Sequence, residues 1–214
     1  MHNFNLKTNN IITCEDFLPQ KEIDFIYMDL LNLRGLFEEE NWEYSDGNKA
    51  NLPIKNCGGK GLVIKDEEEE KKSKCPHIFN LKERFFSPGV MFFIDSMKHN
   101  TIFNLLPISH FEWHIHIVSY SNGGYYDWHR DRANDTLFTF NLVLSKSPSM
   151  KGGDFLFNDE KIIKIENRHN CLCIFPSYIP HAVTKITIDE EKSMPFLEQR
   201  FSIQYWVKLN NVQK

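Results

Sequence analysis

From residue 111 onward the chain is a succession of short apolar runs, each broken by glycine, proline, asparagine or aspartate. The runs are rich in β-branched and aromatic residues, which favour strands. We expect strands at 111–120, 125–132, 136–145, 153–158, 161–167, 171–175, 181–188 and 200–209. Short strands separated by turn signals indicate a sandwich or barrel rather than a parallel sheet.

The first 110 residues have a more helical pattern, which predicts a support for this β core. We expect a short strand within 3–13 and helices over about 20–33 and 89–99. The apolar faces of these helices are predicted to contain Phe25, Met28, Leu30 and Leu31, and Met91, Phe92, Ile94 and Met97, respectively. Residues 41–60 are rich in turn formers and indicate a loop. The charged run 65–74 is interpreted as a solvated excursion.

Composition narrows the class of protein. The 25 Lys and Arg against 29 Asp and Glu give a net charge of −4, which argues against nucleic-acid binding by bulk charge. No apolar run is long enough to cross a membrane. The N-terminus lacks the pattern of a secretory signal, and the odd number of cysteines favours reduced thiols. We therefore expect a cytoplasmic protein without a membrane partner.

His169, Cys171 and Cys173 form an H-x-C-x-C row that could be read as a zinc site. The row lacks a convincing fourth ligand and the usual two-residue gap between cysteines. We favour the alternative, in which the cysteines are small buried side chains on a strand.

One group of polar residues suits metal chemistry. His129 and Asp131 are separated by one residue in a predicted strand, so their side chains share a face. His181 begins another predicted strand, after a turn bracketed by two prolines. Two histidines and one carboxylate are a ligand set that suits Fe(II) and leaves coordination positions open. His114 and His116 also alternate on a strand, but no carboxylate accompanies them, and we favour a structural role.

Arg200 opens the last apolar strand, and alternation places its side chain on the face opposite Phe201 and Ile203. An arginine facing a barrel interior is costly unless an anion neutralises it. No acidic residue on that strand is available. A bidentate carboxylate of a small ligand would suit the guanidinium group.

These residues lie in segments that resemble the Fe(II)- and 2-oxoglutarate-dependent oxygenases, in particular the branch similar to prolyl 4-hydroxylases. The resemblance is carried by Y-S-N-G-G-Y-Y-D-W-H-R-D, G-G-D-F-L-F, F-P-S-Y-I-P-H-A-V and R-F-S-I-Q-Y-W, and covers about residues 111–209. It implies an α+β, mainly β, fold whose core is a double-stranded β-helix, or jelly roll. Residues 1–214 would form one dioxygenase domain, with 1–110 as strand and helical support and 111–209 as the jelly-roll core.

The resemblance also implies roles for individual residues. His129, Asp131 and His181 would be the iron ligands and the catalytic centre. Arg200 would bind the distal carboxylate of 2-oxoglutarate, and the Tyr120 hydroxyl would donate a hydrogen bond to this cosubstrate. The remaining pocket candidates are Tyr126 and Asn141. The interval from His181 to Arg200 is longer than the family commonly has, which indicates a longer hairpin and leaves Lys185 as an alternative to Arg200.

The activity implied is hydroxylation of an unactivated C–H bond, coupled to oxidative decarboxylation of 2-oxoglutarate. The cofactors and cosubstrates would be Fe(II), 2-oxoglutarate and O₂, with ascorbate in support. The expected substrate is a prolyl or other side chain of a peptide, protein or free amino acid. The alternatives are an oxygenase that dealkylates nucleobases, which the negative charge and the lack of a second arginine on the last strand disfavour, and a jelly-roll binding protein without enzymatic activity.

Overall fold

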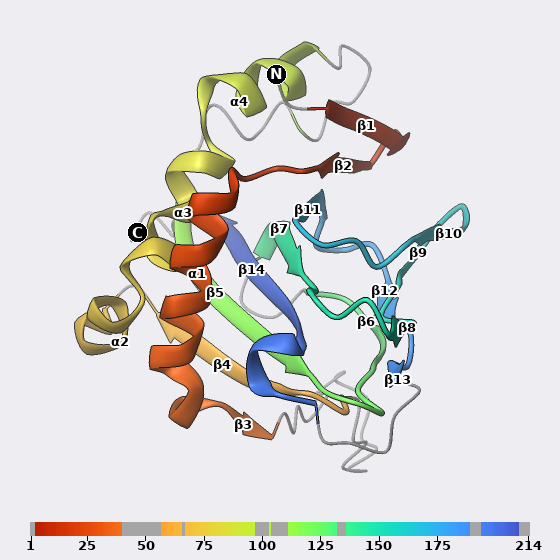
Figure 1. The fold of residues 1–214 in the computed structure, drawn as a ribbon. Coiled ribbons are helices and arrows are strands. Elements are labelled where there is room, and N and C mark those ends of the chain that lie inside the picture. The colour runs from red at the N-terminus through yellow and green to blue at the C-terminus, as the bar shows by residue number, and fades with distance from the viewer. Residues whose placement is uncertain are drawn as a thin grey trace, which may run out of the picture.

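The centre of the molecule is a large twisted sheet with a smaller sheet facing it (Figure 1). The computed structural model describes residues 3–39, 57–65, 67–96, 103, 111–131, 136–188 and 194–209. The large sheet has the strand order β1-β2-β11-β7-β14-β5-β4-β3, and the smaller one β10-β9-β12-β6. A third pair joins β13 to β8. The strand pairs among the described residues are all antiparallel, and the expected jelly-roll core of a mainly β protein is confirmed.

The strands agree closely with the eight expected runs. The bounds in the C-terminal half are β5 (Phe111–Tyr120), β6 (Tyr126–His129), β7 (Thr136–Leu144), β8 (Met150–Lys151), β9 (Phe155–Asp159), β10 (Lys161–Ile165), β11 (Cys171–Pro176), β12 (His181–Val183), β13 (Thr187–Ile188) and β14 (Arg200–Leu209). The expected strand over 181–188 is in fact two strands, β12 and β13. The long interval between His181 and Arg200 contains β13, which pairs with β8. Residues 189–193 of this interval lie outside the described part.

The N-terminal part differs more from expectation. The single strand expected within 3–13 is a hairpin, β1 (Asn3–Thr8) and β2 (Ile11–Glu15), and β2 pairs with β11 of the large sheet. Two further strands, β3 (Glu38–Glu39) and β4 (Lys60–Lys65), extend the other edge, where β4 pairs with β5. The segment therefore contributes strands to the main sheet as well as helices that cover it. The loop expected over 41–60 falls mostly on residues 40–56, outside the described part.

The helices are α1 (Gln20–Leu33), α2 (Glu69–Lys74), α3 (Pro76–Phe85) and α4 (Pro88–Ser96), with short 3₁₀ turns at η1 (Arg34–Leu36) and η4 (Phe196–Glu198). The charged run 65–74, expected to be a solvated excursion, contains the helix α2, none of whose residues is buried. Three ion pairs at helical spacing support α2, namely Lys71–Glu68 at 2.7 Å, Lys72–Glu69 at 2.9 Å and Lys74–Glu70 at 2.8 Å. The sequence reasoning did not identify α3.

The two helices expected from the sequence are present, but their apolar faces are partly different. In α1 the buried stripe is Ile23, Ile26, Tyr27, Leu30 and Leu33. Met28 and Leu31, which we expected to face inward, are 60% and 50% exposed. In α4 the buried residues are Val90 and Ile94, whereas Phe92 is 75% exposed; Met97 lies outside the described residues. Several apolar residues adjoin each stripe, so spacing alone did not identify the buried face.

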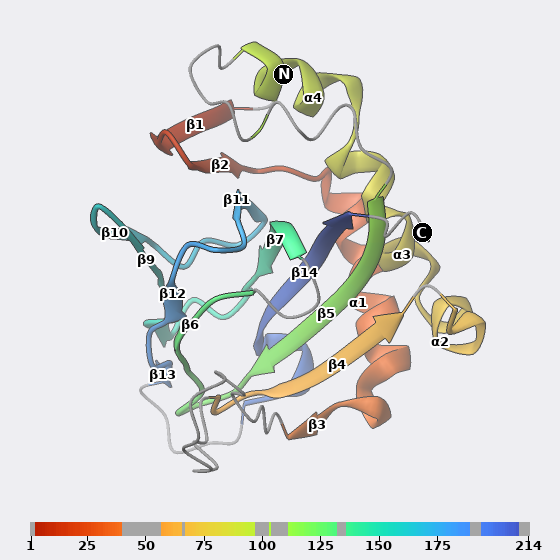
Figure 2. The ribbon, with the colours of Figure 1, turned by 180° about the vertical axis from the view of Figure 1, so that it is seen from behind.

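Viewed from the two sides, α1 and α3 cover one face of the large sheet, and the small sheet lies against the other (Figures 1 and 2). Successive side chains of β14 point to opposite faces of the large sheet, so they belong to two different hydrophobic cores. Phe201, Ile203, Tyr205 and Val207 pack toward the helices, whereas the intervening residues face the space between the sheets. The core between the sheets is aromatic and sulfur-rich, with Phe155, Phe157, Phe175, Cys171 and Cys173 among its members.

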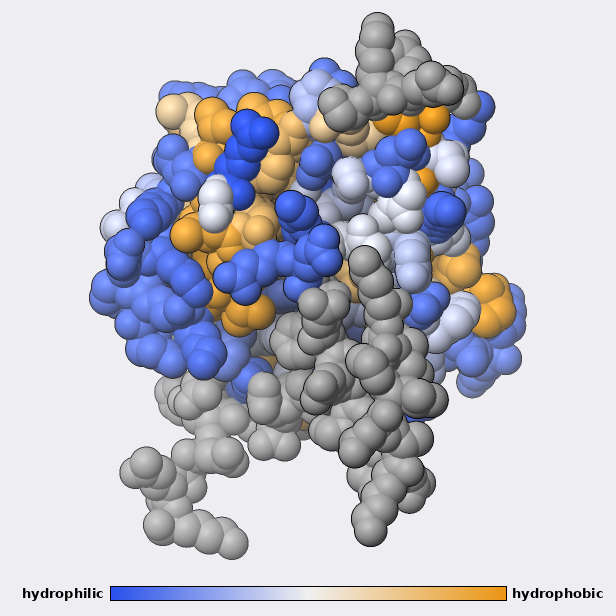
Figure 3. Space-filling model, turned by 90° about the horizontal axis from the view of Figure 1, so that it is seen from below, coloured by the Kyte–Doolittle hydropathy of each residue, from blue (hydrophilic) through white to orange (hydrophobic). Residues whose placement is uncertain are grey.

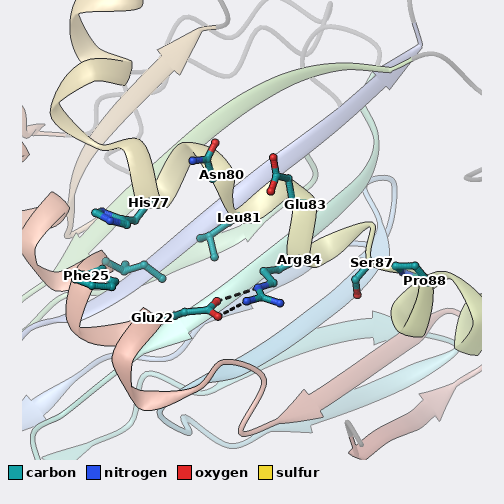
Figure 4. Close-up of a pocket in the computed structure, with 10 residues that line it drawn as sticks. Glu22, Phe25, His77, Asn80, Leu81, Glu83, Arg84, Ser87 and Pro88 are labelled. Carbon is teal, nitrogen blue, oxygen red and sulfur yellow. Dashed lines mark hydrogen bonds and ion pairs between the residues drawn. The ribbon is translucent and has the colours of Figure 1, made fainter.

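On their outer side, α1 and α3 border a cavity of about 460 Å³ (Figure 4). The ion pair between Glu22 of α1 and Arg84 of α3 lies in its wall and joins the two helices. Hydrophilic residues cover most of the described surface seen from below, and apolar residues form separate areas within it (Figure 3). Among the described helices, none has the length and apolar character needed to cross a membrane.

Asn170 fixes the turn between β2 and α1 to the start of β11. Its backbone has φ of +57°, a left-handed conformation that asparagine tolerates. Its side chain accepts a hydrogen bond from Leu18 N at 2.9 Å and donates one to Leu18 O at 2.8 Å. Both bonds are buried, so this one residue satisfies two backbone groups that cannot reach water.

We expect Asn170→Ala to lower the free energy of unfolding by roughly 2–4 kcal/mol, because it leaves two buried backbone groups of Leu18 without partners. Urea unfolding followed by circular dichroism measures the change. The matched control is Asn158→Ala, at an exposed position of β9, which should change the value by less than about 0.5 kcal/mol. Equal losses in the two variants would contradict the role assigned to Asn170.

Candidate metal centre and cosubstrate pocket

His129, Asp131 and His181 meet at one place between the two sheets. Each offers one ligand atom, and these atoms all lie within 4.8 Å of one another. His129 Nε2 is 3.6 Å from Asp131 Oδ1, and His181 Nε2 is 3.5 Å from Asp131 Oδ2. The three side chains are 9%, 3% and 1% exposed, respectively. The described residues contain no other such cluster of three.

Strand pairing brings the two histidines together. In the antiparallel pair β12–β6, His181 lies directly opposite His129. Asp131 follows the end of β6, where its backbone N–H donates to Ser177 O at 3.0 Å. Ser177 belongs to the proline-bracketed turn that leads into β12. The turn therefore fixes the carboxylate and the second histidine at the same time.

Hydrogen bonds to the backbone orient both imidazole rings. His129 Nδ1 is 2.7 Å from Asp127 O, and His181 Nδ1 is 3.0 Å from Ile179 O. A carbonyl oxygen only accepts, so each Nδ1 carries a proton, and in the neutral tautomer with this proton Nε2 presents its lone pair. The Nε2 atom of His181 is buried and makes no hydrogen bond. Histidines that bind a metal are usually neutral, with a free Nε2 and an Nδ1–H that donates a hydrogen bond to the protein.

The carboxylate is held in a similar way. Thr139 on β7 donates to Asp131 Oδ2 at 2.7 Å, and its hydroxyl also lies 3.1 Å from Ser177 Oγ. The bond orients the carboxylate, whose other oxygen, Oδ1, lies 3.6 Å from His129 Nε2. Sequence reasoning missed Thr139. A usable signal was its position two residues before Asn141, on the same face of the expected strand.

Burial determines the protonation of His129. Desolvation, followed by the neighbouring His181, lowers the pKa of His129 to about 4, although the Asp131 carboxylate acts in the opposite direction. The ring is therefore neutral at neutral pH, as a metal ligand must be. The three side chains fit a divalent metal of borderline softness such as Fe(II), because two imidazoles and one carboxylate leave the other coordination positions open.

The Arg200 side chain is fully buried between the sheets, as expected from its place on β14. Tyr120 and Phe155 lie on it, with ring centroids 5.1 and 5.0 Å from the guanidinium carbon. Nη1 donates to Ser202 Oγ at 2.9 Å, whereas Nε and Nη2 make no hydrogen bond. The backbone of Gly153 also lies close to the Arg200 side chain. A Cβ added at residue 153 would be 2.9 Å from Arg200 Cδ.

No carboxylate forms an ion pair with Arg200 among the described residues. Burial lowers the pKa of Arg200, yet a guanidinium remains charged in proteins. A buried cation with two unsatisfied donors is costly unless an anion completes it. A carboxylate from a small ligand fits this need. The alternative cation, Lys185, is exposed, so the geometry favours Arg200 over Lys185.

The other candidate residues are also on the inner face. Tyr120 is fully buried and pairs with Arg200 across β5 and β14. The ring of Tyr126 lies 4.0 Å from that of His129, centroid to centroid. Asn141 is fully buried, and neither polar atom of its side chain has a hydrogen-bond partner. Buried amides are normally satisfied, so Asn141 is positioned for a ligand or a water molecule.

The histidines that we considered structural have partners on β14. His116 Nδ1 is 3.3 Å from Gln204 Oε1, which also accepts from Trp206 Nε1 at 3.0 Å. His114 Nδ1 is 3.1 Å from Lys208 Nζ. Neither histidine joins a cluster of three ligand groups among the described residues. Gln204, which sequence reasoning did not identify, connects the side chains of His116 and Trp206.

The H-x-C-x-C zinc site does not form. Cys171 and Cys173 are buried free thiols, as we favoured. His169 is turned elsewhere, because its Nδ1 accepts a hydrogen bond from Ser145 N at 3.1 Å.

Comparison with known proteins supports the resemblance found in the sequence. Residues 115–208 match the model of the 2OG-Fe(II) oxygenase superfamily. This segment contains His129, Asp131, His181 and Arg200. No curated protein matches the sequence.

Solved structures share the fold over nearly the whole chain. A prolyl hydroxylase from Trichoplax adhaerens, in complex with a peptide fragment of the hypoxia inducible factor oxygen degradation domain, is 19% identical, with a TM-score of 0.62 over 95% of this chain and 85% of that one. A prolyl-4-hydroxylase from Pseudomonas putida is 17% identical, with a TM-score of 0.58 over 96% and 95%. A 2OG-Fe(II) oxygenase family oxidoreductase from Burkholderia pseudomallei is 12% identical, with a TM-score of 0.56 over 95% and 87%. Together with the matched segment, these neighbours confirm that the chain resembles the Fe(II)- and 2-oxoglutarate-dependent oxygenases.

Removing the hydroxyl that orients Asp131 should weaken metal binding. We expect Thr139→Val to lower the affinity for Mn(II), an ion that O₂ does not oxidise readily, by about 10–100-fold. Calorimetric titration measures the affinity. The matched control, Thr187→Val at an exposed position on β13, should leave the dissociation constant unchanged. An unchanged affinity in Thr139→Val would show that the carboxylate does not need this bond.

The pKa of His129 predicts a pH dependence in the metal-free chain. The pKa of His129 has its ordinary value of 6.5 in the unfolded chain and is about 4 in the folded chain. At a pH between these two values, the unfolded chain binds a proton on this histidine that the folded chain does not bind. The free energy of unfolding should therefore fall as the pH falls through this window, by up to about 3 kcal/mol. Urea unfolding of wild type and His129→Gln isolates this contribution, because the variant should lack it. Parallel pH profiles for the two chains would contradict the assignment.

Proposed function

We propose that this protein is an Fe(II)- and 2-oxoglutarate-dependent oxygenase that hydroxylates an unactivated C–H bond. The observation that carries the proposal is the convergence of His129, Asp131 and His181 between the sheets, together with the unsatisfied guanidinium of Arg200 in the same core. The superfamily match over residues 115–208 gives independent support.

In this proposal His129, Asp131 and His181 hold the metal. When bound, Fe(II) with 2-oxoglutarate and O₂ supplies the oxidative decarboxylation and the oxidising power for hydroxylation. The backbone carbonyls of Asp127 and Ile179 keep both Nδ1 atoms protonated, so Nε2 of each ring is the ligand atom.

The cosubstrate site in this proposal is built around Arg200. Its Nε and Nη2 donors would receive the distal carboxylate of 2-oxoglutarate as a bidentate pair. Tyr120 and Phe155 exclude water from the guanidinium by lying on it. A dry site strengthens the ion pair and protects the reaction from side products. Tyr126 and Asn141 are further proposed contacts of the pocket.

The proposed substrate is a prolyl or other side chain of a peptide, protein or free amino acid. The support is a likeness of fold, because two structural neighbours are prolyl hydroxylases and one of them is in complex with a peptide fragment. A cytoplasmic location and a supporting role for ascorbate stay predictions.

Arg200 and Lys185 can be separated by a binding experiment. We expect Arg200→Lys to weaken 2-oxoglutarate binding to the Mn(II)-loaded chain by about 10–100-fold, because a lysine cannot make the bidentate pair. Lys185→Met should bind normally. Anaerobic calorimetry measures both dissociation constants. Weaker binding in Lys185→Met with normal binding in Arg200→Lys would assign the carboxylate to Lys185 instead.

Turnover tests the activity itself. The full chain with Fe(II), ascorbate, O₂ and 2-oxoglutarate should form succinate even without a primary substrate, and His129→Ala should abolish this. His77→Gln, on α3, is the matched control and should retain it. Peptides that contain proline should then be screened for succinate release above this background and for a gain of one oxygen by mass spectrometry. Succinate formation that persists in His129→Ala, or that is absent from wild type, would contradict the proposal.

A further inference from the structure

The amide of Asn141 is buried between the two sheets without a partner. The residue is 0% exposed, and neither Oδ1 nor Nδ2 makes a hydrogen bond within the described part of the chain. Buried amides are normally hydrogen-bonded, because an unsatisfied amide costs stability. An asparagine that the fold keeps under these conditions points to a ligand that completes it.

Asn141 lies next to the residue that holds the carboxylate of the candidate metal site. On β7, alternation turns Thr139, Asn141 and Val143 toward the space between the sheets. Thr139 donates to Asp131 Oδ2 at 2.7 Å, so the metal ligands lie at the level of Thr139. Asn141 is the next inward residue of the strand, one step closer to Val143.

The guanidinium of Arg200 lies on the other side of Asn141. Val143, the next inward residue after Asn141, pairs with Ser202 on β14. The Ser202 hydroxyl accepts a hydrogen bond from Arg200 Nη1 at 2.9 Å, so the guanidinium reaches the level of Val143. A ligand that joins the metal site to Arg200 therefore passes over Asn141.

The neighbours of Asn141 in the large sheet do not satisfy its amide. Its register partners are Cys173 on β11 and Gln204 on β14, and neither forms a hydrogen bond with its side chain. The Gln204 carbonyl instead accepts from Trp206 Nε1 at 3.0 Å and lies 3.3 Å from His116 Nδ1. No described residue therefore completes the Asn141 amide.

The charges of the site favour a neutral donor at this position. The guanidinium of Arg200 would balance one carboxylate of a dicarboxylate ligand. A divalent metal carries one charge more than the Asp131 carboxylate neutralises, and this charge would balance the second carboxylate. The Nδ2 group of Asn141 can then donate to a ligand oxygen without adding a charge. A water molecule that enters with the ligand can complete Oδ1.

We propose that Asn141 binds the oxo-acid end of 2-oxoglutarate, the end that carries the keto group and the adjacent carboxylate, by donation from Nδ2. This inference rests on the proposed function and divides the cosubstrate between two residues. Arg200 holds the distal carboxylate, and Asn141 holds the end nearer to the metal ligands. Asn141 therefore selects for a ligand with an oxygen acceptor at that end.

The test compares 2-oxoglutarate with oxalate, which resembles the oxo-acid end but has no distal carboxylate. Anaerobic calorimetry of the full, Mn(II)-loaded chain measures both dissociation constants. We expect Asn141→Val to weaken the binding of both ligands by about ten-fold, because each loses a hydrogen bond from the amide. Arg200→Lys should weaken the binding of 2-oxoglutarate alone. The matched control is Cys173→Ala, at the register partner on β11, which should bind both ligands as wild type does.

Equal oxalate affinities in wild type and Asn141→Val would overturn the proposal, while binding of 2-oxoglutarate to wild type would leave the proposed function standing. A ten-fold loss of Mn(II) affinity in Asn141→Val would also overturn it, because the amide would then act on the metal ligands. A wild type that binds oxalate but not 2-oxoglutarate would contradict the proposed function itself. The two failures are therefore distinguishable.

Stability gives a second readout that needs no ligand. Urea unfolding of the metal-free chain should show no loss of stability in Asn141→Val, because the amide makes no hydrogen bond and valine favours strands. A lower urea midpoint in Asn141→Val than in wild type would show that the amide supports the fold. That result would overturn the inference that Asn141 serves a ligand.

Discussion

The pairing of β12 with β6 is the contact on which the candidate site depends. It sets His181 opposite His129, although the two residues are far apart in the sequence. The turn before β12 then holds Asp131 through the carbonyl of Ser177. A slip of one residue in this register would turn one histidine to the outer face and separate the ligands. The candidate metal site is thus a consequence of strand register, and the aromatic core around it keeps that register fixed.

The same sheet architecture explains how a buried cation is retained. On β14 the residues that face the helices are apolar, and they anchor the strand in the outer core. The alternating inner face carries Arg200, Ser202 and Gln204 into the space between the sheets. Burying these groups costs stability. The apolar face offsets that cost, and the unsatisfied donors of Arg200 remain available for an anion.

Much of the β core could be predicted from the sequence, because strand alternation and turn residues are local signals. The expected runs coincide with β5, β7, β9, β11 and β14 within a few residues. The site candidates His129, Asp131, His181 and Arg200 followed from spacing and from the family resemblance. Their convergence required the register between strands that are distant in the chain, which spacing alone does not define.

The rest depended on tertiary contacts. The β1–β2 hairpin and β4 join the edges of the large sheet, and only the neighbouring strand distinguishes such segments from loops. The charged run became α2 because its lysines and glutamates pair at helical spacing, a pattern that also suits a solvated loop. Met28 and Leu31 are exposed because other apolar residues of α1 face the sheet. Thr139 and Gln204 act through a second residue, so no motif identified them.

The most direct test of the central claim is a crystal soaked anaerobically with Mn(II) and measured for anomalous scattering. We predict one strong peak per chain, about 2.2 Å from Nε2 of His129, Nε2 of His181 and a carboxylate oxygen of Asp131. A peak at another group of residues, or none between these three side chains at saturating Mn(II), would contradict the account.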